Sequence, residues 1–227
     1  MRVDAAAPGK KVRLGILLSG RGSNFLAIAE SIRAGRLPSV EIAIVISNVA
    51  EAPGIAAAAQ LGLPNSVLIS KGRKRAEHDA DVAALLKAHG VDLICLAGYM
   101  RLLSPEFVAA FPHRILNIHP SLLPAFPGLD AQEQAFNYGV KVAGCTVHFV
   151  DAGTDTGPII AQRAVPVLPG DDFDSLRARI LIEEHALLLQ VLGWIAEGRV
   201  RVVPGELGRR PRVMVSEEAM RGREPLP

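Results

Sequence analysis

Short apolar runs rich in Val, Ile and Leu alternate with helix-like segments along the first half of the chain. The runs occupy residues 12–18, 40–47, 93–97 and 115–118, with a shorter candidate at 66–69. The intervening segments have helical character at 24–34, 53–61, 75–89 and from 105 onward. Runs that are apolar at every position are typical of strands buried on both faces of a parallel sheet. The alternation therefore predicts an α/β fold with a doubly wound, mostly parallel, Rossmann-type sheet.

The pattern changes after about residue 130. Two apolar runs, 142–150 and 159–167, are joined by the short polar loop DAGTDTGP. A connection of this length favours an antiparallel pair, because parallel neighbours need a crossover of a dozen or more residues. A long helix at 173–197 and a strand candidate at 213–215 follow. We therefore expect a C-terminal antiparallel extension of the parallel sheet.

Chain length and composition limit the domain organisation. The chain has 227 residues, of which 49% are hydrophobic, enough for one α/β domain or two small ones. We expect one domain over residues 12–203, divided into halves of about 12–112 and 113–203. Residues 1–11 are predicted to form a flexible N-terminal tail, and residues 204–227 a C-terminal extension.

Charge, cysteines and histidines argue against several functional classes. The net charge of +2 gives no strongly basic face, so nucleic acid is not expected as a partner. No run approaches the ~20 apolar residues of a membrane helix. The start of the chain lacks the apolar core of a secretory signal, so we expect a cytoplasmic location.

Cys95 and Cys145 are predicted to be buried, reduced thiols. The six histidines have no His or Cys partner at ligand spacing, so no metal is expected.

In a parallel sheet, ligands bind beyond the carboxyl ends of the strands, and unusual residues gather there in this chain. The first such loop is SGRGSN at 19–24, between a strand and a helix. Its glycines allow close backbone approach, and the free N–H groups at a helix start attract anions. The G-x-G-x-x-G fingerprint fails at Phe25, and no Gly-Lys-Ser/Thr follows. The loop is interpreted as either a site for a single phosphate or an ordinary tight turn.

Polar side chains also follow two later strands. Asn117 and His119 lie two residues apart at a strand end and would project from the same side. An amide and an imidazole so placed can stabilise an oxyanion, although a polar strand end shaped by the following prolines is equally consistent. Asp155 could orient a histidine through its carboxylate or belong to a plain hairpin. The residues do not decide whether His148 supports the site or packs in the core.

The last helix carries a carboxylate on its apolar face. The inner stripe of this helix consists of Phe173, Leu176, Ile180, Leu187, Val191 and Ile195. Glu184 lies within this stripe, whereas Glu183 is turned away and is predicted on a solvated face. A buried carboxylate without a partner is strongly unfavourable. We therefore expect Glu184 to have a hydrogen-bonding or cationic partner, either in a structural ion pair or as a substrate ammonium.

Four segments together resemble the phosphoribosylglycinamide formyltransferase family. They are SGRGSN at 19–24, GYMRLLSP at 98–105, NIHPSLLPAFPG at 117–128 and VHFVDAGTDTGPII at 147–160. The likeness extends from about residue 12 to 203, and implies a phosphate-binding first half and a folate-binding, catalytic second half. It implies transfer of the formyl group of 10-formyltetrahydrofolate, the co-substrate, to the amine of glycinamide ribonucleotide in purine biosynthesis. The enzyme would be a monomer or homodimer, without a metal.

The same resemblance implies residue roles. Asn117, His119 and Asp155 correspond to the family's catalytic trio. Gly22, Ser23 and Asn24 correspond to its phosphate loop, and Glu184 to the carboxylate that receives the glycinamide amine. The implied folate-binding residues are Arg75, Met100, Arg101, Leu102, Leu103, Asn117, Asp151, Ala152, Gly153, Thr154 and Asp155. Arg21 and Leu181 depart from the family pattern, so the substrate contacts around them stay open.

Three other functions are alternatives. A hydrolase that releases formate from formyltetrahydrofolate would keep the catalytic trio but would need no phosphate loop, and its relatives are expected to carry a preceding regulatory domain. A methionyl-tRNA or sugar-nucleotide formyltransferase is expected to have a further C-terminal domain, for which the residues after 203 are too few. A non-catalytic nucleotide-binding module is disfavoured by the complete trio.

Overall fold

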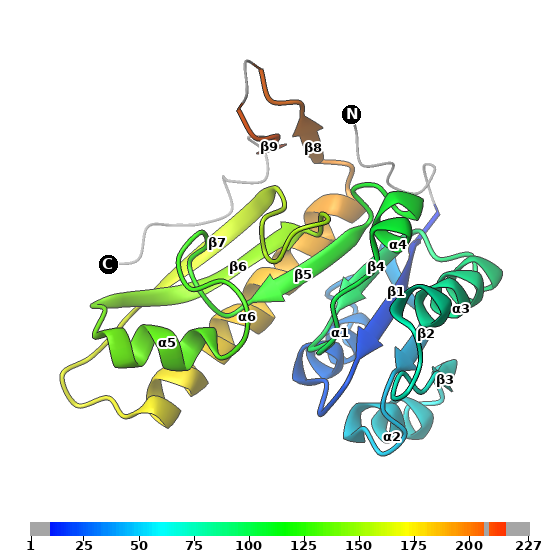
Figure 1. The fold of residues 1–227 in the computed structure, drawn as a ribbon, viewed down its shortest axis with the longest axis horizontal. Helices are drawn as coiled ribbons and strands as arrows, with labels where there is room; N and C mark the ends of the chain where they lie inside the picture. The colour runs from blue at the N-terminus through cyan, green and yellow to red at the C-terminus, as the bar shows by residue number, and fades with distance from the viewer. Residues whose placement is uncertain (1–9, 207–208, 217–227) are drawn as a thin grey trace.

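The computed structural model describes residues 10–206 and 209–216. The predicted tail at 1–11 and the predicted extension at 204–227 therefore lie partly outside the described residues. A seven-stranded sheet with the order β3-β2-β1-β4-β5-β6-β7 runs through the molecule (Figure 1). Its strands are β1 (Val12–Leu18), β2 (Val40–Ser47), β3 (Asn65–Val67), β4 (Leu93–Leu96), β5 (Ile115–His119), β6 (Val142–Phe149) and β7 (Ile159–Pro166).

The strand directions change once across the sheet. Strands β1 to β5 pair in parallel, whereas β6 is antiparallel to both β5 and β7. The prediction of a mostly parallel sheet with a C-terminal antiparallel extension is confirmed. The connection between β6 and β7 is the DAGTDTGP loop, as its length indicated.

Helices cover both faces of the sheet. Those in the described residues are α1 (Ser23–Arg33), α2 (Pro53–Gln60), α3 (Arg75–Ala88), α4 (Pro105–Ala110), α5 (Ala131–Tyr138) and α6 (Phe173–Ala196). In Figure 1, α3 and α4 lie in front of the sheet, and α1 and α6 lie behind it. Two apolar clusters result, because neighbouring strand residues point to opposite faces: Ile16 packs in the cluster with α1 and α6, and Leu17 in the cluster with α3 and α4.

Both cysteines are buried free thiols, as predicted. In the described part of the chain, no helix is long and apolar enough to cross a membrane.

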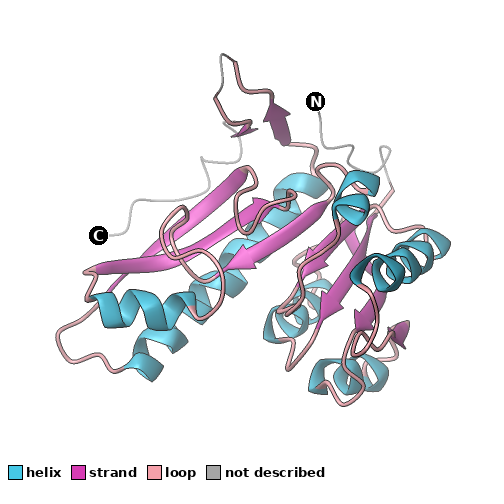
Figure 2. Ribbon diagram, in the orientation of Figure 1, coloured by secondary structure: helices cyan, strands magenta, loops and turns pink. Residues whose placement is uncertain are grey.

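Two elements were not predicted from the sequence. Helix α5 is only eight residues long, begins after Asp130 in a left-handed conformation without a side-chain cap, and buries the small residues Ala131 and Ala135. A short helix without a side-chain cap, whose buried residues are alanines, gives little periodic signal. The other element is β8 (Val200–Val203), which pairs antiparallel with β9 (Arg212–Val215) as a hairpin beyond the main sheet (Figure 2).

Gly15 provides a test of packing within the sheet. It lies at a register shift in β1, where an added Cβ would be 2.5 Å from Leu86 Cδ2 and 2.9 Å from Val91 Cγ1. We expect Gly15→Ala to lower the free energy of unfolding by about 1–3 kcal/mol, because it overpacks the contact between β1 and α3. Urea denaturation measures this loss.

The matched control is Gly193→Ala in α6, where the new methyl would lie 3.8 Å from Leu37. This variant should be stabilised by up to about 1 kcal/mol, because alanine favours the helix. Unchanged stability of Gly15→Ala would contradict the tight packing at that position.

Candidate active site

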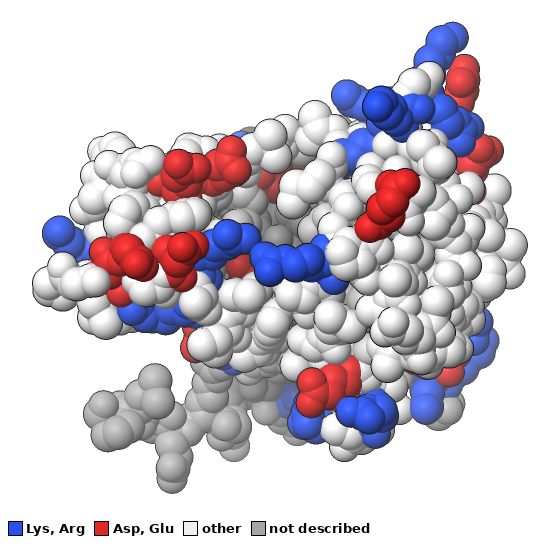
Figure 3. Space-filling model, turned by 90° about the horizontal axis from the view of Figure 1, so that it is seen from below, with Lys and Arg blue, Asp and Glu red and all other residues white. Residues whose placement is uncertain are grey.

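The site lies where the carboxyl ends of the parallel strands meet. The chain leaves β1 at Leu18, β4 at Leu96 and β5 at His119, and each strand is followed by one of the loops singled out in the sequence. Figure 3 shows the molecule from below, the side toward which the arrows of these strands point in Figure 1. Lys and Arg side chains lie beside a hollow in the middle of this face.

The predicted catalytic trio is brought together in three dimensions. Strand β5 presents Asn117 and His119 on one side, and the loop after β6 folds back over them with Asp155. The Asp155 Oδ2 atom lies 3.3 Å from His119 Nδ1, and Asp155 Oδ1 accepts a hydrogen bond of 3.3 Å from Asn117 Nδ2. His119 is 4% exposed, so the contact is shielded from solvent. The sequence left open whether Asp155 orients a histidine or belongs to a plain hairpin. In the structure its carboxylate lies beside His119.

Backbone geometry fixes the position of Asp155. The residue has a φ of 53°, in the left-handed region that is uncommon for residues other than glycine. The backbone N–H of Gly128 donates a 2.8 Å hydrogen bond to Asp155 Oδ2. Burial by itself raises the pKa of Asp155. The neighbouring His148 ring, the hydrogen bond from Gly128 N–H and the nearby charge of His119 outweigh burial and lower the pKa below its ordinary value. The carboxylate is therefore ionised at neutral pH.

His148 belongs to the site rather than to the core alone. It faces Asn117 across the antiparallel pair of β5 and β6. Its Nδ1 lies 2.9 Å from its neighbour's carbonyl, Phe149 O, and therefore carries the hydrogen in the neutral ring. The free Nε2 then accepts a hydrogen bond of 3.2 Å from Asn117 Nδ2. His148 thus orients the amide of Asn117, a role that the sequence left undecided.

Both ring nitrogens of His119 face oxygen acceptors. Nε2 lies 2.8 Å from the carbonyl of Phe126, and Nδ1 faces Asp155. A neutral imidazole can donate from only one nitrogen, whereas an imidazolium donates from both. The surroundings therefore suit a protonated His119.

Glu184 has the hydrogen-bonding partner that its position on the helix predicted. The carboxylate is 6% exposed and accepts hydrogen bonds from Asn24 Nδ2 at 3.1 Å and from Gln132 Nε2 at 3.4 Å. Burial raises its pKa to about 7, against the lowering effect of the Asn24 bond. The positive charge of Arg177 also lowers the pKa, but both hydrogen-bond donors to Glu184 are neutral. Such a carboxylate is suited to bind a substrate cation.

The prediction for Glu183 was wrong. It was predicted on a solvated face, but it is half-buried and forms a 2.7 Å ion pair with Arg163. The ion pair reaches from α6 to β7, which covers this side of the helix.

The predicted phosphate loop precedes α1 directly. Gly22 has a φ of 67° and is the N-cap of the helix, which begins at Ser23. The first turn contains no acidic residue, so the N–H groups and the positive end of the helix dipole face no competing carboxylate there. Asn24, in the same turn, connects this loop to Glu184. Arg21 is exposed.

The predicted folate residues are distributed unevenly. Met100 and Leu102 are 70% and 55% exposed, and the backbone N–H of Met100 donates to Ser19 Oγ at 2.8 Å. This bond places residues 100–103 beside the phosphate loop. Arg75 is exposed at the start of α3, and no described contact connects it with the trio. Residues 152–154 are also exposed, in a turn where Asp151 Oδ1 accepts from Gly153 N and Thr156 Oγ1.

Two hollows lie outside the trio. One, of about 360 Å³, lies between α3 and α4, and another, of about 650 Å³, is lined by Asp151, Thr156 and residues of β9. Among the described residues, no group of three or more His, Cys, Asp or Glu side chains is arranged to hold a metal ion.

Sequence reasoning did not single out Ser19, Gln132 or Asp79 individually. Ser19 lies inside the SGRGSN motif, but the motif was interpreted through its glycines. Asp79 lies on the buried face of α3 with Val82 and Leu86. The stripe argument that identified Glu184 would have identified Asp79 as well. Gln132 lies on α5, which was not predicted.

Comparison with known proteins identifies the family. Residues 12–192 match the formyl transferase family, and the chain belongs to it. A curated phosphoribosylglycinamide formyltransferase from Mycobacterium tuberculosis is 42% identical over 203 residues, which are 89% of this chain and 92% of that protein. The family resemblance noted in the sequence is therefore confirmed.

Three other relatives are informative, and one of them is much longer and one is named for a different function. The trifunctional purine biosynthetic protein adenosine-3 of Drosophila melanogaster is 45% identical over 86% of this chain, but the chain spans only 15% of that protein. The structure of glycinamide ribonucleotide transformylase 1 from Symbiobacterium toebii is 50% identical, with a TM-score of 0.85, over 93% of this chain and 97% of that one. A formyltetrahydrofolate deformylase from Pseudomonas syringae is more distant, with 28% identity and a TM-score of 0.83 over 91% of this chain and 66% of that one.

The raised pKa of Glu184 leads to a prediction of pH-dependent stability. The free energy cost of ionising this buried group develops as the pH rises from about 4.5, its ordinary pKa, to about 7. Glu184→Gln removes the cost, and its amide oxygen can still accept from Asn24. The melting temperature of the variant, relative to that of the unchanged protein, should therefore increase between about pH 5 and pH 8. The corresponding gain in stability is up to about 3 kcal/mol.

Glu183→Gln is the matched control, because it removes the neighbouring carboxylate from an ion pair. Its relative melting temperature should not rise over the same pH range. A pH-independent difference for Glu184→Gln would contradict the raised pKa.

Proposed function

We propose that this chain transfers the formyl group of 10-formyltetrahydrofolate to the amine of glycinamide ribonucleotide, producing formylglycinamide ribonucleotide and tetrahydrofolate. The observation that carries the proposal is the convergence of Asn117, His119 and Asp155 within hydrogen-bonding distance. The relatives of similar length, which are named for this activity, support it. The cytoplasmic location and the division of the domain into two halves remain predictions.

The reaction is a direct acyl transfer. The lone pair of the substrate amine forms a bond to the formyl carbon, and the carbonyl π electrons move to oxygen. One proton passes from the attacking nitrogen to N10 of the folate, and the bond between N10 and the formyl carbon breaks. Asp155 holds the His119 imidazolium and assists these proton transfers.

Asn117 and His119 would donate hydrogen bonds to the oxyanion. Both bonds of Asn117 Nδ2, to His148 and Asp155, are long for hydrogen bonds, at 3.2 and 3.3 Å. A negatively charged oxygen can replace one of them, since it is a stronger acceptor. His119 Nε2 must likewise turn from the Phe126 carbonyl to the oxyanion. The transfer step therefore includes a small adjustment of the segment that carries Phe126.

The ribonucleotide would bridge two elements. Gly22, Ser23 and Asn24 offer the helix start to its phosphate, and Glu184 receives its amine. The hydrogen bond between Asn24 and Glu184 connects the two ends of this site. Such a bridge gives the substrate a fixed orientation relative to the trio, which is the main requirement of a two-substrate transfer.

Folate deformylation is the competing activity. A deformylase needs no site for a ribonucleotide, and the buried Glu184 beside Asn24 would then serve no substrate. Formyl transfer with purified protein distinguishes the two. Gain of one formyl group by glycinamide ribonucleotide supports the proposal, whereas release of free formate at the same rate without ribonucleotide supports the deformylase.

Substitution tests the assigned roles. Asn117→Ala and His119→Ala should each lower turnover by about 10²–10³-fold, because each removes one oxyanion donor. Steady-state kinetics measures the loss, and circular dichroism checks that folding is intact. Glu183→Gln, altered outside the trio, should keep its turnover. Near-normal turnover in a folded Asn117 or His119 variant would rule out that residue's role.

A further inference from the structure

The segment from Gly98 to Ser104 has no regular secondary structure between β4 and α4. It nevertheless holds the large apolar side chains of Met100 and Leu102 in solvent, at 70% and 55% exposure. Exposed apolar side chains do not stabilise a loop by burial. Tyr99, by contrast, is buried in the core cluster beside α3 and α4, and Leu103 packs against that cluster. The conformation of Met100 to Leu102 therefore depends on these neighbouring contacts and on bonds to the backbone of the segment.

The first end of the segment is held by Ser19. The backbone N–H of Ser19 donates to Gly98 O at 3.0 Å, and its hydroxyl accepts from Met100 N at 2.8 Å. The same hydroxyl donates to Asn48 Oδ1 at 2.6 Å, which fixes its direction. Ser19 is also the first residue of the phosphate loop, so it joins the two loops physically.

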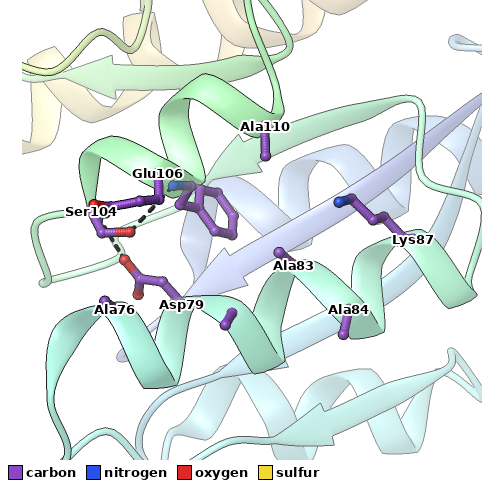
Figure 4. A pocket seen from close by; sticks show the side chains of 10 residues that line it. Ala76, Asp79, Ala83, Ala84, Lys87, Ser104, Glu106 and Ala110 are labelled. Atoms are coloured by element: carbon purple, nitrogen blue, oxygen red, sulfur yellow. Dashed lines mark hydrogen bonds between the residues drawn. The ribbon is translucent and has the colours of Figure 1, made fainter.

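The second end is held by Asp79 of α3. Its Oδ2 accepts a 2.6 Å hydrogen bond from the backbone N–H of Ser104, and Figure 4 shows this bond across the groove between α3 and α4. Asp79 is 1% exposed, and its other oxygen lies 3.4 Å from Nδ1 of the fully buried His78. The opposite ring nitrogen of His78 is 2.8 Å from Leu68 O.

The negative charge of Asp79 also reaches the segment itself. Burial and, after it, this charge raise the pKa of the Tyr99 hydroxyl. Asp79 is thus a buried carboxylate that lies outside the trio and holds a loop by accepting the hydrogen bond from Ser104 N–H. A buried carboxylate is costly unless its oxygens accept hydrogen bonds, and the backbone N–H of Ser104 supplies one to Asp79.

We propose that Ser19 and Asp79 are positioning residues that hold the two ends of the segment 98–104, so that Met100 to Leu103 form a preformed wall of the folate site. The proposal rests on the proposed function for the identity of the ligand. The anchoring itself does not, because both bonds exist in the protein alone. Neither residue touches the reacting atoms, so their loss should weaken folate binding rather than the chemical step.

Kinetics with Asp79→Ala tests the second anchor. The KM for 10-formyltetrahydrofolate should rise about ten-fold or more, because a buried backbone donor loses its acceptor. The KM for the ribonucleotide and kcat should stay within about two-fold of the original values. Asp79→Asn keeps an oxygen acceptor for Ser104 N–H and should restore most of the folate affinity. A folate KM unchanged in Asp79→Ala, or equally raised in Asp79→Asn, would overturn the proposal.

Two further variants separate anchoring from general destabilisation. Phe107→Leu weakens the same contact between α3 and α4 without removing the Asp79 bond, and its folate KM should be unchanged. Ser19→Ala removes the hydroxyl that accepts from Met100 N–H but keeps the backbone bond to Gly98 O. It should also raise the folate KM, which keeps the test usable if Asp79→Ala does not fold. The anchoring would be contradicted if Phe107→Leu raised the folate KM, or if Ser19→Ala left the folate KM unchanged.

Hydrogen exchange distinguishes failure of the anchor from failure of the function. Without any substrate, the backbone amides of 98–104 should exchange faster in Asp79→Ala and Ser19→Ala than in Phe107→Leu. If exchange behaves so but the unchanged protein does not transfer formyl groups, the proposed function is wrong and the anchoring stands. Equal exchange in all variants would overturn the anchoring whatever the activity.

Discussion

The carboxylate of Asp155 is shared among partners from three separate segments of the chain. One oxygen accepts from Gly128 N and faces His119; the other faces Asn117 and His148. A carboxylate can accept several hydrogen bonds at once, and here each bond fixes a different donor. The relative positions of Asn117 and His119, the two proposed oxyanion donors, therefore depend on this single group. The left-handed backbone of Asp155 shows that the turn adopts an uncommon conformation to place it there.

This arrangement is possible because β5 separates the parallel from the antiparallel part of the sheet. Its carboxyl end lies at the same edge of the sheet as that of β1, which precedes the predicted phosphate loop, with β4 between the two strands. Its other neighbour, β6, runs in the opposite direction, so the loop after β6 begins at the amino end of β5 and must fold back to reach the site. Asn117 and His119 thus project from a regular strand. The carboxylate that orients them, that of Asp155, comes from the loop after β6.

The sequence predicted most of this framework because the framework follows from local patterns. The apolar runs gave the strands of the main sheet nearly to the residue, and the position of Glu184 in a helical stripe predicted a buried carboxylate with a partner. Neither pattern could give the identity of that partner, since Asn24 is 160 positions away in the chain. The same limit applies to Gly128, Phe126 and His148. Gly128 and Phe126 act through backbone direction in a loop, which has no periodicity, and His148 acts through the register of β6 against β5. Helix α5 was missed because two buried alanines carry little signal.

The length of α6 has a consequence for how the protein forms during synthesis. This helix has 24 residues, about 36 Å, and packs against α1, α5, β2, β6 and β7. The ribosome makes it after the whole seven-stranded sheet, so the faces of β6 and β7 that it covers stay exposed until the helix has emerged. Exposed apolar sheet surface of this kind promotes association between nascent chains. Glu184, the proposed amine-binding carboxylate, lies on the same late helix that covers this surface. The proposed site is therefore complete only once this aggregation-prone face has been covered.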